Sequence, residues 1–199
     1  MTAARHDYRV LSSAERVRNR VFSIVTDEVE MPGGKAVARD YMVHVGAVGV
    51  VALDDADRVA LIRQYRHPLG VALWELPAGL VDVPGEALVD GAARELAEEA
   101  DLTAARWDLL VEIHSSPGSS TEKIRVFLAR GLAAVPEGER HTRTDEESEM
   151  FVRWVPLDEA VEMALSGEIT NSACVAGVLA TQAAKARDWA TLREASAAT

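Results

Sequence analysis

The sequence predicts an α/β or α+β sandwich in which a sheet packs between helices. Strand-like runs lie on both sides of one strongly periodic helix, and two further helical patterns close the chain. Of the 199 residues, 48% are apolar and 27% are charged, which is typical of a globular domain with a sizeable core. No internal repeat and no long linker divides the chain.

The N-terminal part is expected to be separate from the main domain. Residues 1 to about 15 are polar and lack periodicity, so we expect a mobile arm there. Strand patterns at 20–30 and 35–44 flank a turn at 31–34 (MPGG). We therefore assign residues 1–44 to an N-terminal arm with β-strands and residues 45–199 to the main domain.

The main domain is expected to begin with a buried strand. The run 45–53 (VGAVGVVAL) is nearly all apolar, so this strand should be covered on both faces. The elements expected after it are strands at 58–65 and 73–76, a helix at 86–100, strands at 107–114 and 123–129, a polar acidic loop at 131–149, a strand at 150–155, and helices at 157–165 and 170–186.

Composition excludes several classes of protein. The formal net charge of −11 disfavours a protein whose main partner is a nucleic acid, because such binding depends on Lys and Arg neutralising phosphates. A small anionic ligand remains compatible with this net charge, since a bound metal or a few arginines can reverse the local field.

No apolar run has the length of a membrane span, and the N-terminus has no hydrophobic signal region. The single cysteine, Cys174, permits no intramolecular disulfide, so we expect a cytoplasmic protein with Cys174 in its core.

Three glutamates lie close together on the helix at 86–100. At 100° per residue, the apolar face comprises Val89, Ala92, Ala93, Leu96 and Ala100. Glu95, Glu98 and Glu99 lie beside that face at i,i+3 and i,i+4 spacing, where like charges destabilise a helix by roughly 0.2–0.5 kcal/mol per pair. Arg94 can offset Glu98 but not all three acids.

The three acids have two interpretations. On their own, a solvated acidic face is the simpler one. The alternative is a cation site, because carboxylates on a rigid helix suit Mg²⁺. The preceding loop favours this alternative: Gly79 and Gly85 permit tight backbone geometry, and the carbonyl of Ala78, where a strand ends, could face the same cation.

This stretch resembles the box that defines the Nudix hydrolases. Gly79 is followed by Glu86, then by seven residues, then by Arg94 and the run 95–99 (ELAEE). There are two departures. Six residues rather than five separate Gly79 from Glu86, which a bulge in the loop can absorb. Asp101 stands where the family has a glycine that caps the helix in a left-handed conformation, which Asp tolerates better than most residues.

The resemblance implies an α/β/α sandwich with a mixed sheet and a divalent-metal site. Carried over to this sequence, the metal ligands are Glu95, Glu99 and the carbonyl of Ala78, with Glu98 close by as a further catalytic residue. Mg²⁺ is the expected ion, and Mn²⁺ is a possible substitute. The ion would neutralise a diphosphate, orient the attacking water and lower its pKa.

Segments outside the box resemble the ADP-ribose pyrophosphatase subfamily. They are residues 64–66 (QYR), residues 74–79 (WELPAG), and Pro117, which lies sixteen residues past Asp101. An aromatic residue is common in that subfamily where Ser119 stands here. The subfamily implies a nucleotide substrate and a homodimer in which N-terminal strands help build both active sites.

The same resemblance suggests roles in substrate binding. Arg66 is the candidate for binding the diphosphate, since a planar guanidinium suits phosphate oxygens; the alternative is a surface ion pair. Glu75 is expected to accept a hydrogen bond from a ribose hydroxyl; alternatively it braces the loop or pairs with a nearby arginine. Adenine should stack on an aromatic ring, and Phe22 and Tyr41 are candidates that could equally belong to the core.

The acidic run 145–150 (DEESEM) resembles the loop that supplies a catalytic glutamate in these enzymes. Glu147 is the first candidate for the general base, followed by Glu146 and then Glu149. A solvated acidic loop is the alternative for each of them. The activity implied is hydrolysis of ADP-ribose to AMP and ribose 5-phosphate. The rivals are another nucleotide sugar or a dinucleotide as substrate, and a non-catalytic nucleotide sensor.

Overall fold

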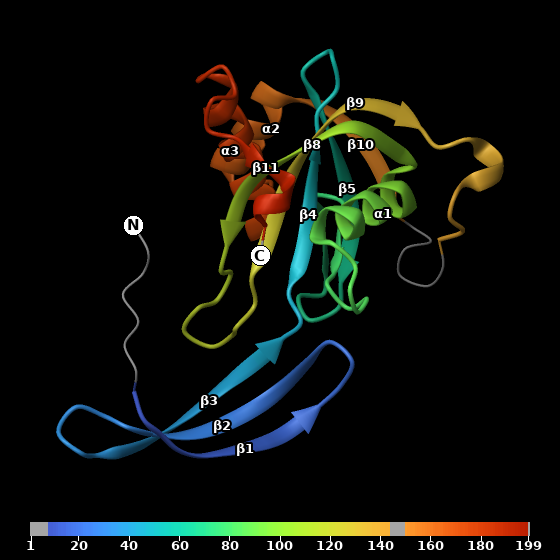
Figure 1. Ribbon diagram of the computed structural model, residues 1–199. Coiled ribbons are helices and arrows are strands. Elements are labelled where there is room, and N and C mark those ends of the chain that lie inside the picture. The colour runs from blue at the N-terminus through green and yellow to red at the C-terminus, as the bar shows by residue number, and fades with distance from the viewer. Residues whose placement is uncertain (1–7, 144–149, 199) are drawn as a thin grey trace. The chain divides into compact units, whose positions relative to one another are not determined.

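The computed structural model describes residues 8–143 and 150–198, which fall into two compact units (Figure 1). One unit comprises Met1–Val45 with Ser116–Glu122, and the other comprises Gly46–Ser115 with Lys123–Thr199. The sequence pattern predicts a division after residue 44 but does not indicate that residues 116–122 belong with the N-terminal strands.

The first unit contains an antiparallel sheet in the order β1-β2-β3. Its strands are β1 (Val10–Arg18), β2 (Phe22–Glu30) and β3 (Ala36–His44). The expected mobile arm is wrong for residues 10–15, which pair with β2. Nearly every side chain of β1 is exposed, so the strand depends on its ladder of backbone hydrogen bonds and carries no alternating apolar pattern.

The second unit contains two sheets. They consist of β4 (Ala47–Ala52), β5 (Arg58–Arg66), β6 (Val71–Glu75), β7 (Ala78–Leu80), β8 (Leu102–Ile113), β9 (Ile124–Ala134), β10 (Phe151–Pro156) and β11 (Arg193–Glu194). The larger sheet has the order β11-β8-β9-β4-β7 and the smaller one β10-β5-β6. Strands β4 and β9 are parallel, whereas the other pairs are antiparallel, so the larger sheet is mixed.

Helices cover both faces of these sheets (Figure 1). Helix α1 (Leu88–Ala100) packs on one side, and α2 (Leu157–Ser166) and α3 (Ser172–Lys185) pack on the other. The predicted α/β/α sandwich with a mixed sheet is confirmed. Short 3₁₀ helices occur at Glu137–Glu139 and Ala195–Ala197. Among the described residues, no helix combines the length and apolarity that a membrane crossing requires.

The core has two halves separated by the sheets. Val51 and Leu53 of β4 pack in the half beneath α2 and α3, whereas Val48 and Val50 pack in the half beneath α1. The prediction that this strand is covered on both faces is therefore confirmed. Two expected boundaries are wrong: β8 begins at Leu102 rather than 107, and β9 continues to Ala134 into the predicted loop, because the two strands form a long antiparallel pair.

Helix α1 begins and ends close to its predicted limits. It starts at Leu88 rather than Glu86, because Gly85 adopts a φ of +80° in the preceding turn and Ala87 is extended. At the C-terminal end Asp101 adopts φ 55° and ψ 36°, the left-handed conformation predicted for it. Its backbone N–H caps the carbonyls of Ala97 and Leu96.

Cys174 is fully buried in α3, as expected for a core residue. Burial, assisted by the negative charge of Glu75, raises the pKa of its thiol well above the ordinary value. The thiol is therefore protonated at pH 8 and shielded from solvent. We expect Ellman's reagent to leave Cys174 unmodified in the folded protein and to react with one thiol after unfolding in guanidinium chloride. Rapid stoichiometric reaction of the folded protein would contradict this placement.

Candidate active site on helix α1

The site is built where strand β7 lies against helix α1. Strand β7 pairs with β4, which fixes its position at the edge of the larger sheet. A Cβ atom added to Gly79 would overlap the carboxyl group of Glu95. A glycine is therefore required at this position, because its missing side chain leaves the space that the Glu95 carboxylate fills.

The neighbouring residue of β7 holds a second carboxylate. The backbone N–H of Ala78 donates a hydrogen bond of 2.7 Å to Oε2 of Glu99. Glu99 is only 6% exposed, so this bond compensates in part for the cost of burying the carboxylate. Two consecutive residues of one strand thus fix two glutamates from one face of α1.

Arg94 connects the remaining acids of the site. Its Nη1 lies 2.5 Å from Oε1 of Glu95 and 3.5 Å from Oε2 of Glu98, and its Nε and Nη2 each lie 3.2 Å from a carboxylate oxygen of Glu86. The predicted pairing of Arg94 with Glu98 is thus present, together with two pairs that helical spacing does not indicate. The hydrogen bond to Glu86, reinforced by the charge of Glu95, raises the pKa of Arg94 further, so it stays charged.

The donor set fits a divalent cation. Glu86, Glu95, Glu98 and Glu99 supply four carboxylates against the single guanidinium of Arg94, which leaves an excess of three negative charges. Carboxylate oxygens are ligands that Mg²⁺ and Mn²⁺ prefer. Within the described residues, no group of three or more acidic, histidine or cysteine side chains is arranged so that it could hold a metal ion as it stands. Glu95 is directed to Arg94 and Glu99 to the Ala78 N–H, so these are the contacts with which an ion would compete.

Arg66 and Glu75 pair with each other across strands β5 and β6. Arg66 donates from Nε to Oε1 of Glu75 at 2.8 Å and from Nη2 to Oε2 at 2.5 Å. The Glu75 side chain is 3% exposed and that of Arg66 is 43% exposed. This is the alternative considered for Glu75, a pairing with a nearby arginine. The pair holds the guanidinium in one orientation while leaving part of it accessible to a ligand.

Comparison with known proteins decides the family. A model described as the NUDIX domain matches residues 43–174, which include β7, α1 and every carboxylate described above.

The chain belongs to the Nudix hydrolase family.

Within this family the chain resembles the ADP-ribose pyrophosphatase subfamily. It is 46% identical over 180 residues to an ADP-ribose pyrophosphatase of Mycobacterium tuberculosis, which covers 90% of this chain and 86% of the relative. A Bacillus subtilis protein of the same name is 31% identical over 164 residues, covering 82% and 86%. Among solved structures, an ADP compounds hydrolase superposes with a TM-score of 0.78 at 21% identity, covering 94% of this chain and 100% of that one, and so shares its fold.

Two sets of predicted Nudix site residues lie outside this cluster. Glu146, Glu147 and Glu149 fall outside the described residues. Pro117 lies in the loop of residues 116–122, which belongs to the first unit and is attached to β3. In that loop the Ser119 carbonyl accepts from the Met42 N–H at 2.8 Å, and the Thr121 hydroxyl accepts from the His44 N–H at 3.0 Å.

Sequence reasoning missed one arginine of the Nudix box environment. Arg143 donates from Nη2 to Oδ2 of Asp101 at 2.8 Å and from Nε to the carbonyl of Glu98 at 3.1 Å. It lies 42 residues from Asp101 in a segment without periodicity, so no local pattern could indicate it. The only sequence signal is the acid itself, because an aspartate at a helix C-terminus needs a cation nearby.

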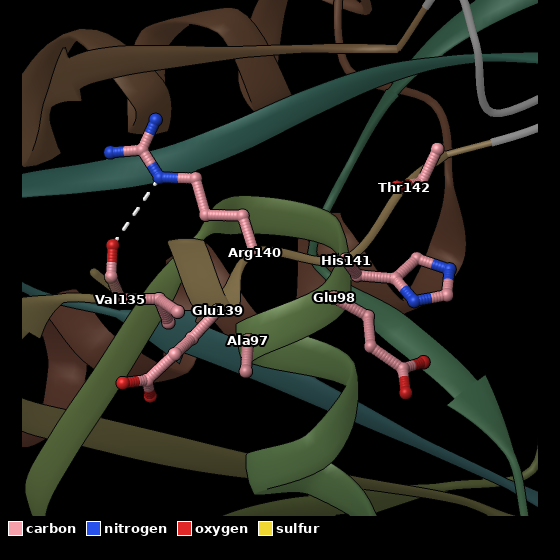
Figure 2. A pocket seen from close by; sticks show the side chains of 7 residues that line it. All are labelled: Ala97, Glu98, Val135, Glu139, Arg140, His141 and Thr142. Carbon is pink, nitrogen blue, oxygen red and sulfur yellow. Dashed lines mark hydrogen bonds between the residues drawn. The ribbon is translucent and has the colours of Figure 1, made fainter. Parts of the chain in front are cut away.

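A pocket of about 500 Å³ lies beside this contact (Figure 2). It is lined by Ala97, Glu98, Val135, Glu139, Arg140, His141 and Thr142. Figure 2 shows the Glu98 and His141 side chains extending toward the same side, whereas Arg140 turns away to donate to the Val135 carbonyl at 3.3 Å. Glu98 therefore takes part in two features of the structure. Its carboxylate lies near Arg94, and the residue also lines the pocket.

Substituting Gly79 tests the contact between β7 and Glu95. The added methyl group of Gly79→Ala must displace the Glu95 carboxylate or shift β7, since both occupy the same space. We expect kcat to fall about 10²-fold, as is common for a misplacement of about 1 Å, and the free energy of unfolding to fall by roughly 1–3 kcal/mol. Steady-state kinetics and urea unfolding measure the two effects. Gly138→Ala is the control, because a Cβ atom there meets nothing within 4 Å. Wild-type kcat in Gly79→Ala would show that the position of Glu95 has no effect on turnover.

Proposed function

We propose that this Nudix hydrolase cleaves the diphosphate of ADP-ribose, producing AMP and ribose 5-phosphate. The observation that carries the proposal is the pair of carboxylates, Glu95 and Glu99, which consecutive residues of β7 hold on one turn of α1. The names of the relatives from M. tuberculosis and B. subtilis support the choice of substrate.

Each residue of the site would have a separate role in this reaction. Glu95, Glu99 and the carbonyl of Ala78 would hold Mg²⁺, or Mn²⁺ in its place, with Glu98 beside them. The bound ion would supply charge neutralisation to the diphosphate and lower the pKa of a water. Arg66, oriented by Glu75, would bind the phosphate oxygens through the part of its guanidinium that remains exposed. Glu147 would take the proton from the attacking water as it adds to phosphorus.

We further propose a cytoplasmic homodimer. The β1-β2-β3 sheet supports this proposal, because nearly every side chain of β1 and about half of those of β3 are exposed to solvent in the single chain. Pro117, which lies in the loop attached to β3, is a candidate substrate-binding residue on the resemblance to the subfamily. Phe22 and Tyr41 belong to the same sheet as candidates for stacking on adenine, although the Tyr41 hydroxyl already donates to Asp27 at 3.0 Å.

The proposal is tested with purified protein and a panel of substrates. The protein is incubated with ADP-ribose, ADP-glucose, NADH and a dinucleoside polyphosphate, each with Mg²⁺, with Mn²⁺ or with EDTA, and nucleotides are separated by anion-exchange chromatography. We expect the highest kcat/KM for ADP-ribose, with AMP and ribose 5-phosphate formed in equal amounts and no reaction in EDTA. A higher kcat/KM for another nucleotide would correct the substrate. Binding without turnover in either metal would favour a nucleotide sensor.

A further inference from the structure

At the C-terminal end of α1, Asp101 stands where the family pattern has a glycine. Asp101 takes the left-handed conformation that the glycine of the Nudix box would supply, and its N–H caps Ala97 and Leu96. An acid at this end of a helix is unfavourable, because the exposed carbonyls already carry partial negative charge. The last turn of α1 holds Glu98 and Glu99 and contains no basic residue. The backbone role explains the conformation of Asp101 but not the choice of an acid.

Arg143 compensates for this concentration of negative charge. Its guanidinium contacts the Asp101 carboxylate and the Glu98 carbonyl at the same time, at 2.8 Å and 3.1 Å. The side chains of Arg143 and Asp101 are 21% and 23% exposed, so solvent screens this pair less than it screens most surface pairs. The other oxygen of Asp101, Oδ1, is buried without a hydrogen-bond partner among the described residues. Arg143 is thus the side chain to which the Asp101 carboxylate binds.

The contact joins two parts of the chain that matter to the site. On one side is the turn of α1 that carries Glu98 and Glu99. On the other is the segment 140–143, which lines the pocket with His141 and Thr142 and carries Arg143. Arg140, three residues earlier, contacts only the local carbonyl of Val135 among the hydrogen bonds of the described residues, and so makes no equivalent link to α1.

We propose that Asp101 and Arg143 form a positioning pair for the hydrolase reaction. The pair fixes the last turn of α1 and the segment 140–143 against each other, and so sets the placement of Glu98 and Glu99. It replaces a capping glycine with a residue that both caps the helix and binds this segment. This inference rests on the proposed function for its effect on turnover, but its structural part can be tested without activity.

Asp101→Gly separates positioning from folding. Glycine suits the left-handed conformation better than aspartate and removes an unfavourable charge, so a purely structural role predicts equal or higher stability and unchanged turnover. We expect the melting temperature to be equal or higher while kcat for ADP-ribose falls about tenfold and KM stays within about twofold. Wild-type kcat in Asp101→Gly would overturn the proposal.

Three further variants show whether the two residues act together. Arg143→Gln should lower kcat about as much as Asp101→Gly, and the double variant should lower it no further, because each change removes the same contact. Arg143→Lys, which keeps the charge but not the two-pronged geometry, should recover part of the activity. Arg140→Gln is the matched control and should retain wild-type kcat. Multiplicative losses in the double variant would contradict the pairing.

Limited trypsin digestion reports on the contact independently of catalysis. A guanidinium held by Asp101 and the Glu98 carbonyl is less available to the protease than a free one. We expect cleavage after Arg143 to accelerate several-fold in Asp101→Gly, measured by mass spectrometry, with cleavage after Arg140 unchanged. Equal rates of cleavage after Arg143 in the two proteins would show that Asp101 does not hold the Arg143 side chain. If the wild-type protein cleaves no ADP-ribose, the proposed function fails, and the digestion still decides whether Asp101 holds Arg143.

Discussion

Glu99→Gln is expected to lower kcat for ADP-ribose about 10³-fold without destabilising the protein. Glutamine retains an oxygen that can accept from the Ala78 N–H, so the hydrogen bond between β7 and α1 survives. What is lost is one negative charge among the acids of α1, and with it the attraction for a divalent cation. An ion of this kind contributes several kcal/mol to stabilising charge in the transition state, and each 1.36 kcal/mol is a factor of ten in rate.

Stability distinguishes this effect from simple damage. Removing a buried charge from a cluster of like charges relieves repulsion, so the midpoint of thermal unfolding should stay equal or rise. Asp90→Asn is the matched control, since it makes the same chemical change on the exposed first turn of the same helix. Steady-state kinetics and circular dichroism provide the two measurements. Near-normal turnover in Glu99→Gln would show that this helix does not hold the catalytic metal.

Glu147→Gln is expected to lower kcat about 10³-fold while KM for ADP-ribose changes little. General-base catalysis typically contributes 10²–10⁴-fold, and the substitution removes the base without touching the carboxylates of α1. Mg²⁺ affinity, measured by titration calorimetry, should therefore match that of the wild type. This combination of lost turnover and retained binding differs from Glu99→Gln, in which metal affinity falls as well.

The neighbouring glutamates serve as controls for this assignment. Glu146→Gln and Glu149→Gln make the same change in the same acidic run, and each should lower kcat by less than tenfold. If Glu146→Gln instead shows the large effect, the base is Glu146. Wild-type turnover in all three variants would place the base outside this run.

The elements predicted well are those whose own side chains determine their environment. The continuous apolar run at 45–53 specifies a strand buried on both faces, and β4 has that property. The helical period at 86–100 likewise predicts α1, and Ala92, Leu96 and Ala100 of its expected apolar face are buried, whereas Val89 and Ala93 are only partly buried. Strand β1 could not be predicted in this way, because its exposed side chains carry no pattern and its pairing with β2 comes from backbone hydrogen bonds.

The same distinction applies to the site. The spacing of Glu95, Glu98 and Glu99 places them on one helical surface, and the left-handed Asp101 follows from backbone preferences. The contacts of Arg143, by contrast, join residues 42 or more positions apart and depend on how the chain returns to α1. The mutual pairing of Arg66 and Glu75 depends in turn on the register of β5 against β6, which neither strand specifies alone.

The most direct test of the account is a crystal structure with Mn²⁺ and a non-hydrolysable ADP-ribose analogue, examined by anomalous diffraction at the manganese edge. We expect an anomalous peak for a manganese ion that the carboxylates of Glu95 and Glu99 bind, with the diphosphate of the analogue next to the ion. The contrary result would be no manganese between these carboxylates, with Glu95 still paired with Arg94 and Glu99 still accepting from the Ala78 N–H; this cluster of glutamates would then not be a divalent-cation site.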